Sequence, residues 1–481
     1  MASIIPPNLA RFTRAELIEA TGGECDAFDG EVIGVSSDSR AELGGGLFVA
    51  LRGERFDGHG FAAAAVQRGA RVILAEADVG DVGAAAVLRV PSTLDALGRL
   101  GAYHRRRWGR RLAAVAGSVG KTTTRTALFA VAQAAGRAVA CPPGNLNNRI
   151  GVPMVLLTLT HHDDLCVVEL GTSEPGEIER LTAMTDADVG VLTRISLEHS
   201  ERLGGLDAIE HEEGALLRGL RKTASAVINA DDERCVRQLV GSPAGRQLGY
   251  GFRAGSKKAQ NHYRILGQDS LGGGSTRVRI ERPQGALLDV RSPLLGPPGA
   301  YALTAALASV EALLGRSLSG DEVESALASP VLGEPGRLTP IELADGSLLL
   351  DDTYNSSPAS VRSSVNVARQ LADSRSGRLI LVLGEMRELG ALSLDAHREV
   401  GADLVVARPD LLVAFGGDAV AFLDEPKRRG LSVAFGDDAP AALELVRAER
   451  APRDVVLVKA SRSLRAERII AGLRVPESST P

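Results

Sequence analysis

The sequence predicts an α/β protein of three domains, and three observations carry that prediction. A chain of 481 residues has room for about three domains of ordinary size. Short apolar runs alternate with helix-like segments through most of it, which indicates mainly parallel sheets. Between residues 262 and 292 the apolar period falls to two, which predicts an antiparallel hairpin. We therefore expect a small N-terminal α/β domain (1–86), a central parallel sheet with a β insert (87–331) and a C-terminal Rossmann-like α/β domain (332–481).

Composition excludes several classes of protein. Hydrophobic residues make up 44% of the chain and aromatic residues only 3%, so the cores must be built from Ala, Val, Leu and Ile. The net charge of −5 leaves no basic surface for nucleic acid. The four cysteines form no C-x-x-C pair, which is typical of reduced thiols rather than of disulfides or a zinc site. With no signal peptide and no long apolar run, we expect a cytoplasmic protein without a membrane segment, and a monomer, although no sequence feature reports the oligomeric state.

The first predicted domain contains three strand-like runs and one helix-like run. The strands are expected at 31–35, 46–51 and 71–74, and the helix at 59–68. Two polar turns follow the first two strands, at 36–40 and 52–59. On its own, the turn that contains Ser39 and Arg40 is most simply a capped turn.

The central domain is organised around a glycine-rich turn between a predicted strand at 112–116 and a predicted helix at 122–136. Such a turn directs consecutive backbone N–H groups, and the positive end of the helix, toward a phosphate. Lys121 would neutralise the β- and γ-phosphates, and the Thr122 hydroxyl would ligate Mg²⁺. The spacing is shorter than the common phosphate-loop pattern, and the alternative is an ordinary strand-to-helix turn. We favour a nucleoside triphosphate site formed by Gly117, Ser118, Val119, Gly120, Lys121, Thr122 and Thr123.

Other polar side chains of this domain follow predicted strands or occupy loops. Glu169 ends the strand expected at 165–171, and ligands of open parallel sheets lie beyond the carboxyl ends of strands, so Glu169 is placed to hold Mg²⁺. His199 follows the strand expected at 189–193, although a lone loop histidine is more often structural. The Asn-rich loop after the first helix offers amides to a polar ligand through Asn145, Asn147 and Asn148. Further elements are expected as a helix at 207–220, a strand at 225–231, hairpin strands at 276–280 and 287–291, and a helix at 300–314.

The last predicted domain repeats the alternation of strands and helices. Its strands are expected at 348–351, 379–383, 411–415, 432–435 and 455–458. Polar residues again follow several of these strands. They include Asp352, Glu385, Lys459, Ser461 and Arg462.

In this order, these motifs resemble the Mur ligase family of amide-forming enzymes over nearly the whole chain. The segments 38–40 and 47–59 resemble the domain that holds a UDP-sugar, and 117–123 matches the short phosphate loop of the family. The resemblance continues through 144–153, Glu169-Leu170-Gly171, His199, Gly336-Arg337-Leu338 and 352–358. The segments 384–390, with His397, and 459–462 are most specific to the branch that adds D-alanyl-D-alanine.

The resemblance implies an ATP-dependent ligase that joins D-alanyl-D-alanine to UDP-N-acetylmuramoyl-tripeptide through an acyl phosphate, for peptidoglycan synthesis. It does not say whether the third residue of the tripeptide is lysine or diaminopimelate. It leaves two alternatives: a ligase of the same fold with another amino acceptor, and a non-catalytic nucleotide-sugar-binding relative. The implied catalytic residues are Lys121, Glu169 and His199, and two Mg²⁺ ions are expected on Thr122, Glu169 and His199. Arg337 and Asp352 would contact ATP, and the substrates would contact Ser39, Arg40, Asn145, Asn147, Asn148, Glu385, Lys459, Ser461 and Arg462.

The chain departs from the family pattern in two places. Glu213 stands where the family has a carbamylated lysine; we expect it to be catalytic and to offer Mg²⁺ a carboxylate, either from a helix closer to the metal or through a bridging water, the alternative being a solvated residue on a charged helix. Where the family helix that reaches adenine carries two asparagines, this chain has Ala302 and Ala305. We therefore expect weak recognition of adenine, with Tyr301 either stacked on the base or part of the core.

Overall fold

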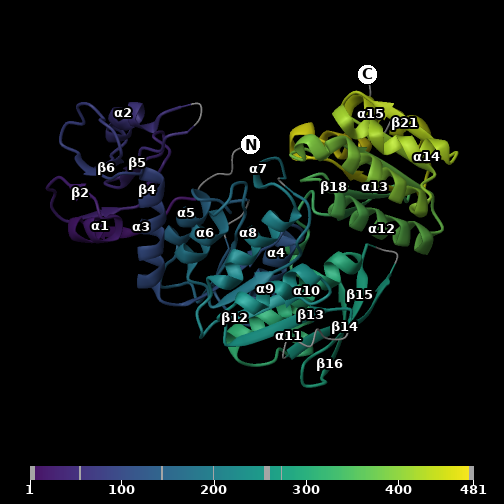
Figure 1. The fold of residues 1–481 in the computed structure, drawn as a ribbon, viewed down its shortest axis with the longest axis horizontal. Helices are drawn as coiled ribbons and strands as arrows, with labels where there is room; N and C mark the ends of the chain where they lie inside the picture. The colour runs from purple at the N-terminus through teal and green to yellow at the C-terminus, as the bar shows by residue number, and fades with distance from the viewer. Residues whose placement is uncertain are drawn as a thin grey trace.

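The computed structural model describes residues 6–53, 56–141, 145–198, 200–253, 261–271 and 274–475. Along these residues the chain forms sheets of two, five, nine and six strands. Figure 1 shows three α/β bodies in chain order, from the purple N-terminal body through the central one to the green and yellow C-terminal one. The predicted fold class is confirmed, including the parallel sheets and the β insert.

The N-terminal body is a five-stranded sheet with a small two-stranded sheet beside it. Its elements are β1 (Arg11–Thr13), α1 (Arg14–Thr21), β2 (Glu24–Cys25), β3 (Glu31–Ile33), β4 (Val35–Ser36), β5 (Leu47–Val49), η1 (Gly58–Phe61), α2 (Ala62–Gln67), β6 (Val72–Ala75) and β7 (Ala86–Arg89). The larger sheet has the order β2-β7-β6-β5-β4, in which only β2 is antiparallel to its neighbour. Because β7 begins at Ala86, this sheet continues past the boundary expected at residue 86.

The helix α3 (Thr93–Trp108) leads into the central nine-stranded sheet, whose order is β16-β15-β14-β13-β12-β11-β8-β10-β9. The strands β9, β10, β8, β11, β12, β13 and β14, in their order across the sheet, are parallel to one another. β15 and β16 add the predicted antiparallel hairpin at the end of the sheet. The central elements are β8 (Arg111–Ala116), α4 (Lys121–Ala134), β9 (Val139–Ala140), α5 (Gly151–Leu157), β10 (Leu165–Glu169), α6 (Glu177–Thr185), β11 (Val189–Leu192), α7 (Ser200–Leu203), α8 (Leu206–Arg218), β12 (Ser225–Asn229), α9 (Glu233–Gln238), η2 (Leu239–Gly241), β13 (Arg246–Gly251), β14 (Asn261–Ser270), β15 (Thr276–Glu281), β16 (Leu287–Ser292), α10 (Gly296–Leu314), α11 (Gly320–Leu327) and η3 (Pro330–Leu332).

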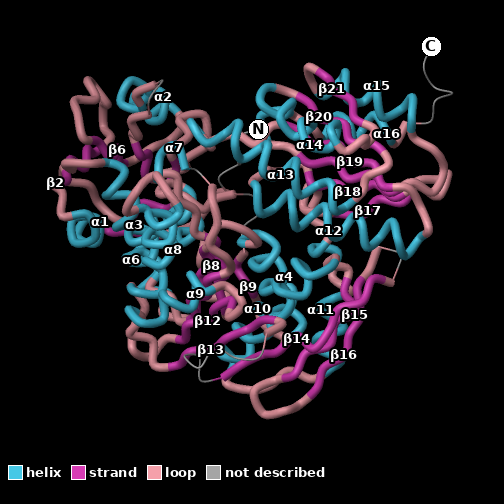
Figure 2. The backbone as a smooth tube through the Cα atoms, turned by 45° about the vertical axis from the view of Figure 1, so that its right-hand side comes forward, coloured by secondary structure: helices cyan, strands magenta, loops and turns pink. Residues whose placement is uncertain are grey.

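The central strand β8 explains why the sequence reads as an unbroken apolar run here. Alternate side chains of a strand point to opposite faces, and in β8 both faces are buried. Ala113 and Val115 join the core beneath α4 and α10, whereas Ala114 and Ala116 join the core beneath α5, α6 and α8. Figure 2 shows the strands enclosed between layers of helix. A parallel strand covered on both sides in this way must be apolar throughout.

The C-terminal body repeats this plan with a six-stranded sheet in the order β17-β18-β22-β19-β20-β21. The helices α12 and α13 cover one face of the sheet, and α15 and α16 cover the other. Its elements are β17 (Thr339–Glu342), β18 (Leu348–Asp352), α12 (Pro358–Arg375), β19 (Leu379–Gly384), η4 (Gly390–Leu392), α13 (Ser393–Ala407), β20 (Leu411–Phe415), η5 (Gly417–Leu423), α14 (Asp424–Arg428), β21 (Val433–Gly436), α15 (Ala439–Glu449), β22 (Val455–Lys459), η6 (Arg462–Leu464) and α16 (Glu467–Leu473).

The helix α10 begins earlier than predicted, so Ala302 and Ala305 lie further along the helix than the sequence suggested. It starts at Gly296 rather than at residue 300, with prolines in its first turn. Ala302 and Ala305 are therefore two turns into the helix, buried in the central core. Tyr301 is half-buried, and its hydroxyl donates a hydrogen bond to Asp231 Oδ2 at 2.7 Å. Tyr301 packs against the central core, as one of the two interpretations of the sequence has it, and weak recognition of adenine stays a prediction.

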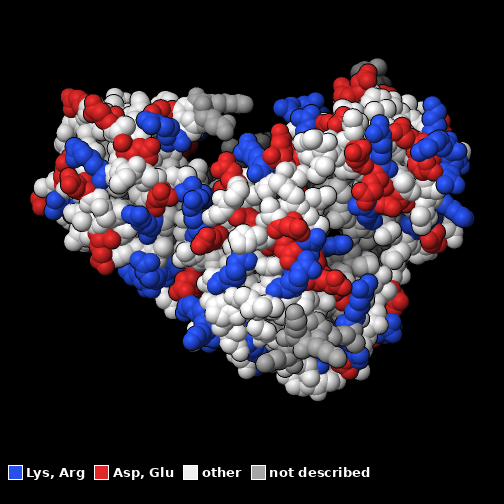
Figure 3. Space-filling view, in the orientation of Figure 1, with Lys and Arg blue, Asp and Glu red and all other residues white. Residues whose placement is uncertain are grey.

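The surface agrees with the mixed charge of the sequence. Figure 3 shows Lys and Arg interspersed with Asp and Glu over the visible face, with no continuous basic area. In the part of the chain that the structure describes, no helix combines the length and the apolar character needed to cross a lipid bilayer.

Candidate active site

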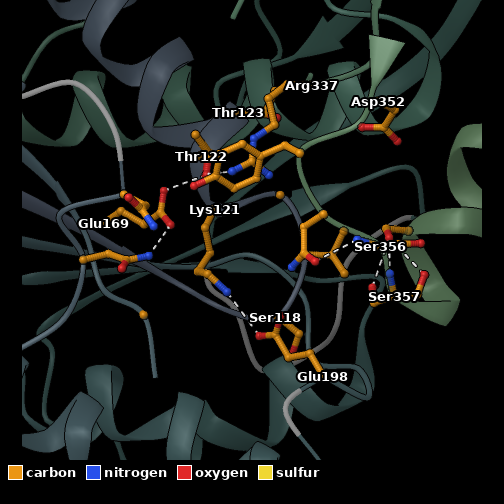
Figure 4. A pocket seen from close by; sticks show the side chains of 18 of the residues that line it. Ser118, Lys121, Thr122, Thr123, Glu169, Glu198, Arg337, Asp352, Ser356 and Ser357 are labelled. Atoms are coloured by element: carbon orange, nitrogen blue, oxygen red, sulfur yellow. Dashed lines mark hydrogen bonds and ion pairs between the residues drawn. The ribbon is translucent and has the colours of Figure 1, made fainter. Parts of the chain in front are cut away.

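A cavity of about 370 Å³ lies where the phosphate loop, the loops after β10 and β11, and the first segments of the C-terminal body meet. Its polar lining gathers residues more than 300 positions apart in the chain (Figure 4). Many of the predicted site residues line it together. They are Ser118, Val119, Gly120, Lys121, Thr122, Thr123, Asn145, Asn147, Asn148, Glu169, Arg337, Asp352 and Lys459.

The phosphate loop has the shape that the sequence predicted. Gly117 and Gly120 have φ angles of +120° and +91°, in the region that glycine adopts most readily. A Cβ atom on Gly117 would come within 2.3 Å of Thr193 Oγ1, so this position also has no space for a side chain. The helix α4 begins at Lys121, directly after the loop. Its N-terminus therefore faces the cavity and favours an anion there.

Glu169 lies beside the phosphate loop because β10 pairs with β8, with Glu169 opposite Val115. Both of its carboxylate oxygens are engaged. Thr122 Oγ1 donates to Oε2 at 2.8 Å, and Asn147 Nδ2 donates to Oε1 at 2.8 Å. A buried carboxylate beside a hydroxyl offers the hard oxygen ligands that Mg²⁺ prefers.

Lys121 points into the cavity and pairs with Glu198. Its Nζ atom lies 3.1 Å from Glu198 Oε1, and only 14% and 11% of the two side chains are exposed. Burial alone would lower the pKa of Lys121, but the negative charges of Glu198, Glu213 and Glu169 raise it above its ordinary value. Lys121 therefore remains protonated and can meet a phosphate.

Glu213 is not the solvated helix residue of the alternative interpretation. Its side chain is completely buried, and its Oε2 accepts a hydrogen bond from the Gly117 N–H at 2.7 Å. Burial raises the pKa of Glu213 to about 8, with Lys121 acting in the opposite direction and Glu198 in the same one. Within the described residues, the second oxygen, Oε1, has no hydrogen-bond partner. A buried carboxylate oxygen without a partner is suited to a cation.

The side chains of the described residues do not by themselves complete a metal site. Among the described residues, no three His, Cys, Asp or Glu side chains are gathered closely enough to hold a metal ion. His199 lies outside the described residues. Thr122 and Glu169, which are joined by a hydrogen bond in the cavity, are donors that fit Mg²⁺, because this ion keeps a small number of protein ligands and completes its shell with phosphate and water.

The C-terminal body contributes a buried ion pair to the cavity. β18 and β22 are parallel neighbours with Asp352 opposite Lys459. Lys459 Nζ donates to Asp352 Oδ2 at 2.7 Å and to the Asn355 carbonyl at 2.8 Å. Ser364 donates to the same Asp352 oxygen at 2.6 Å. The two strand-end residues therefore hold each other in place at the cavity wall.

Arg337 connects the two bodies. Its Nη2 donates to Thr122 Oγ1 at 2.8 Å, and its guanidinium carbon lies 3.7 Å from the centre of the Tyr354 ring. A guanidinium stacked on an aromatic face is held in position while its donors stay available. Tyr354 lines the cavity, and the sequence analysis did not single it out.

Among the described residues, seven predicted site residues do not line the cavity: Gly117 and Glu213 of the central body, and Ser39, Arg40, Glu385, Ser461 and Arg462 of the outer bodies. In the N-terminal body, the exposed Arg40 makes two 2.8 Å hydrogen bonds to Asp38, in the turn that also holds Ser39. In the C-terminal body, Ser461 Oγ accepts from the Arg387 N–H at 2.8 Å and Arg387 pairs with Glu385 at 2.9 Å. Arg462 lies 5.5 Å from the centre of the Tyr354 ring.

His397 supports the C-terminal loop from beneath. It is fully buried, its Nε2 accepts from the Met386 N–H at 2.9 Å, and its Nδ1–H donates to the Ser393 carbonyl at 2.7 Å. Burial lowers the pKa of His397, with the Ser393 hydrogen bond opposing, so the imidazole is neutral. It orders the segment that begins with Glu385.

Glu198 is another site residue that sequence reasoning missed. It lines the cavity and pairs with Lys121, yet the sequence shows only a glutamate in a loop. Its position a few residues after β11 follows the same strand-end rule that identified Glu169. That rule could have singled it out.

Comparison with known proteins agrees with this arrangement. Three family models match the chain: "Mur ligase family, catalytic domain" over residues 31–105, "Mur ligase middle domain" over 115–310 and "Mur ligase, glutamate ligase domain" over 336–462. The UDP-N-acetylmuramoyl-tripeptide–D-alanyl-D-alanine ligase of Escherichia coli K12 is 32% identical over 466 residues, covering 96% of this chain and 98% of the relative. The ligase of the same name from Bacillus subtilis 168 is 29% identical, covering 95% and 97%.

Solved structures show the same likeness in three dimensions. A crystal structure of MurF from Acinetobacter baumannii superposes with a TM-score of 0.85 at 29% identity, covering 97% of this chain and 99% of that one. The MurF ligase of Thermotoga maritima, solved in complex with ADP, gives a TM-score of 0.79 at 28% identity, covering 92% and 96%. The chain belongs to the Mur ligase family, and along its whole length it resembles the UDP-N-acetylmuramoyl-tripeptide–D-alanyl-D-alanine ligases of that family.

Proposed function

We propose that this protein is an ATP-dependent amide ligase that joins D-alanyl-D-alanine to UDP-N-acetylmuramoyl-tripeptide and so forms the pentapeptide precursor of peptidoglycan. The observation that carries the proposal is the cavity in which the phosphate loop, Glu169 and the Asp352–Lys459 pair meet. The 32% identity over 96% of the chain to a ligase of that name supports the choice of substrates. We propose that it acts in the cytoplasm as a monomer.

ATP would bind with its phosphates along residues 118–123. The backbone N–H groups and the α4 N-terminus face that position, and Lys121 adds a positive charge. We assign Arg337 to the phosphates and Asp352 to the nucleotide, because both line the same cavity. Thr122 and Glu169 would hold one Mg²⁺, and Glu213 with His199 the second. These ions would neutralise the developing phosphate charge.

The reaction that these residues would support has two steps. A terminal carboxylate oxygen of the tripeptide bonds to the γ-phosphorus while the bond to ADP breaks, which gives an acyl phosphate. The dipeptide amine then bonds to the acyl carbon, inorganic phosphate leaves, and the amine releases a proton. Little covalent chemistry falls to the protein, so Lys121 and Arg337 would act by positioning and by stabilising charge.

The three bodies would divide the substrates between them. We assign the UDP-sugar to residues 1–86, with Ser39 and Arg40, and include the rest of β7 in that unit. Residues 87–331 would bind ATP, with Asn145, Asn147 and Asn148 near the tripeptide end. Residues 332–481 would bind the dipeptide through Glu385, Lys459, Ser461 and Arg462. Because the outer groups lie off the cavity, bodies that close around the substrates would complete the site and exclude water from the acyl phosphate.

Phosphate release tests the proposal. The protein, ATP, Mg²⁺ and the UDP-linked tripeptide should release phosphate rapidly only when D-alanyl-D-alanine is added, and mass spectrometry should show the pentapeptide product. A single D-alanine or an L-amino acid serves as the control acceptor. Equal product formation with such an acceptor would support a ligase of different specificity, and absence of any product would support a binding protein.

A further inference from the structure

The loop that follows β11 is bound to the phosphate loop along its length. The Thr193 N–H donates to the Ala116 carbonyl at 3.0 Å, and the Ser118 N–H donates to the Arg194 carbonyl at 2.6 Å. The Ser196 N–H donates to Ser118 Oγ at 3.0 Å. These hydrogen bonds determine the position of the following residues, so the placement of Glu198 is a consequence of the fold.

Glu198 faces the position that a phosphate would take. Its side chain lines the cavity, and its Oε1 lies 3.1 Å from the amine of Lys121 (Figure 4). A carboxylate of the cavity lining is thus paired with the amine that an ATP phosphate would contact. A phosphate that reaches Lys121 would be brought next to a second negative charge, which is costly at this low exposure.

The other acidic residues around Lys121 are committed to neighbours. Glu169 binds Thr122 and Asn147 through both oxygens. Glu213 uses one oxygen on the Gly117 N–H and does not line the cavity. The ionised carboxylate of Glu198 beside a phosphate repels it unless a cation or a proton lies between them.

We propose that Glu198 is an additional ligand for the divalent cation that accompanies the terminal phosphates, and that it holds Lys121 until the nucleotide binds. This inference rests on the proposed function, because it requires a nucleotide and its cation in the cavity. Glu198 then has opposite effects in two conditions. Without the cation it repels the phosphate, and with the cation it favours the phosphate, so it couples the two binding events.

The test measures that coupling in the whole protein, using the non-hydrolysable ATP analogue AMP-PNP. Its affinity is determined by calorimetry with EDTA and again with Mg²⁺, for the wild type, Glu198→Gln and Glu233→Gln. Glu233 is an exposed residue of α9, so its substitution removes the same charge without touching the site. We expect Glu198→Gln to bind AMP-PNP more tightly than wild type in EDTA and less tightly in Mg²⁺. The coupling between the ligands should fall by about tenfold, while Glu233→Gln matches the wild type.

A second measurement reports on the metal itself. Mn²⁺ bound with AMP-PNP should show an altered electron paramagnetic resonance spectrum and a weaker affinity in Glu198→Gln. Glu198→Asp keeps the charge but withdraws it by one methylene, so its coupling and its affinity for Mn²⁺ should lie between those of the wild type and Glu198→Gln. If Glu198→Gln does not fold, Glu198→Asp is the variant that tests the proposal. Coupling equal to that of the wild type in both variants would overturn the role of Glu198 while leaving the proposed function intact. A wild-type protein that binds no AMP-PNP under either condition would overturn both.

Discussion

Arg337 and Thr122 are 215 residues apart in the sequence, and their side chains meet at 2.8 Å across the boundary between the central and C-terminal bodies. The same Thr122 hydroxyl donates to Glu169, so one oxygen connects the phosphate loop, a strand end and the segment that leads into the last body. A group that binds to the Thr122 hydroxyl would therefore alter its hydrogen bond from Arg337. We therefore expect nucleotide binding and the position of the C-terminal body to be coupled through this contact.

This contact makes Arg337 the first test. Arg337→Lys keeps the charge but loses the planar stacking on Tyr354 and the donor geometry toward Thr122. We expect the KM for ATP to rise by about tenfold, with the affinity for the UDP-linked tripeptide unchanged. Steady-state kinetics and calorimetry would measure the two quantities. Arg408→Lys, at an exposed position after α13, is the control; an unchanged KM in Arg337→Lys would remove the assigned role.

Lys121→Ala should abolish ligation. The substitution removes the charge that faces the phosphates and leaves Glu198 and Glu213 without their cation. Turnover should fall by at least about 100-fold, in the range found when one group that stabilises a transition state is lost. Binding of the UDP-linked tripeptide, measured by calorimetry, should be nearly unaffected because its assigned site lies in the N-terminal body. Lys427→Ala, at an exposed position, is the control, and a Lys121→Ala protein with a tenth of wild-type turnover would contradict the assignment.

Activity should not depend on bicarbonate. The carboxyl group of Glu213 is a fixed part of its side chain, whereas a carbamylated lysine forms reversibly from CO₂. Turnover of the wild type should be the same in degassed and bicarbonate-supplemented buffer, and Glu213→Lys should be active only when bicarbonate is supplied. Glu213→Ala should lose most of its turnover, since the hydrogen bond to the Gly117 N–H and the free oxygen both disappear. If Glu213→Ala turns over like the wild type, this carboxylate serves neither the loop nor a metal ion.

Asparagine at Ala302 should not improve ATP binding. Ala302 is 2% exposed and packs in the core beneath the central sheet, so an amide there would be buried without partners. We expect Ala302→Asn to lower the free energy of unfolding by about 1–3 kcal/mol, with the affinity for AMP-PNP unchanged in the folded protein. Urea denaturation and calorimetry measure the two effects, and Ala302→Ser gives a smaller polar reference. Tighter nucleotide binding by Ala302→Asn would show that this helix face reaches the base.

Stability should fall on acidification because of His397. Its pKa is lowered in the folded protein from an ordinary value of 6.5, since burial favours the neutral ring. The native state therefore binds fewer protons than the unfolded state in this range, and stability is lost as the pH falls below about 6.5. His397→Asn, which does not titrate, should lack this component of the pH dependence. Urea midpoints of both proteins between about pH 8 and about pH 5 would show it, and parallel curves would exclude His397 as the cause.

Local sequence patterns predicted most of the fold because a strand that is buried on both faces must be apolar at nearly every position. The strands at 112–116 and 411–415 are continuous apolar runs, and both were found where expected. The pattern fails where a strand is covered unevenly or is very short. β14 lies mostly within the stretch where the period of two was noted, but its mixed burial gave no strand bounds, and β9 has only two residues, so neither strand was placed by the prediction.

By itself, the sequence determined which groups could meet a phosphate: a glycine-rich turn, Lys121 and Thr122 at a helix start, and Glu169 at a strand end. These are contacts within a few residues or between adjacent parallel strands, where geometry follows from local rules. Only the tertiary structure decided that Glu213 turns toward Gly117, that Glu198 faces Lys121, and that Ala302 is buried. Those relationships depend on how helices pack on the sheet and how one loop is bound to another. The positions of these side chains are stabilised by contacts between residues far apart in the sequence, and a local sequence pattern holds no information about such contacts.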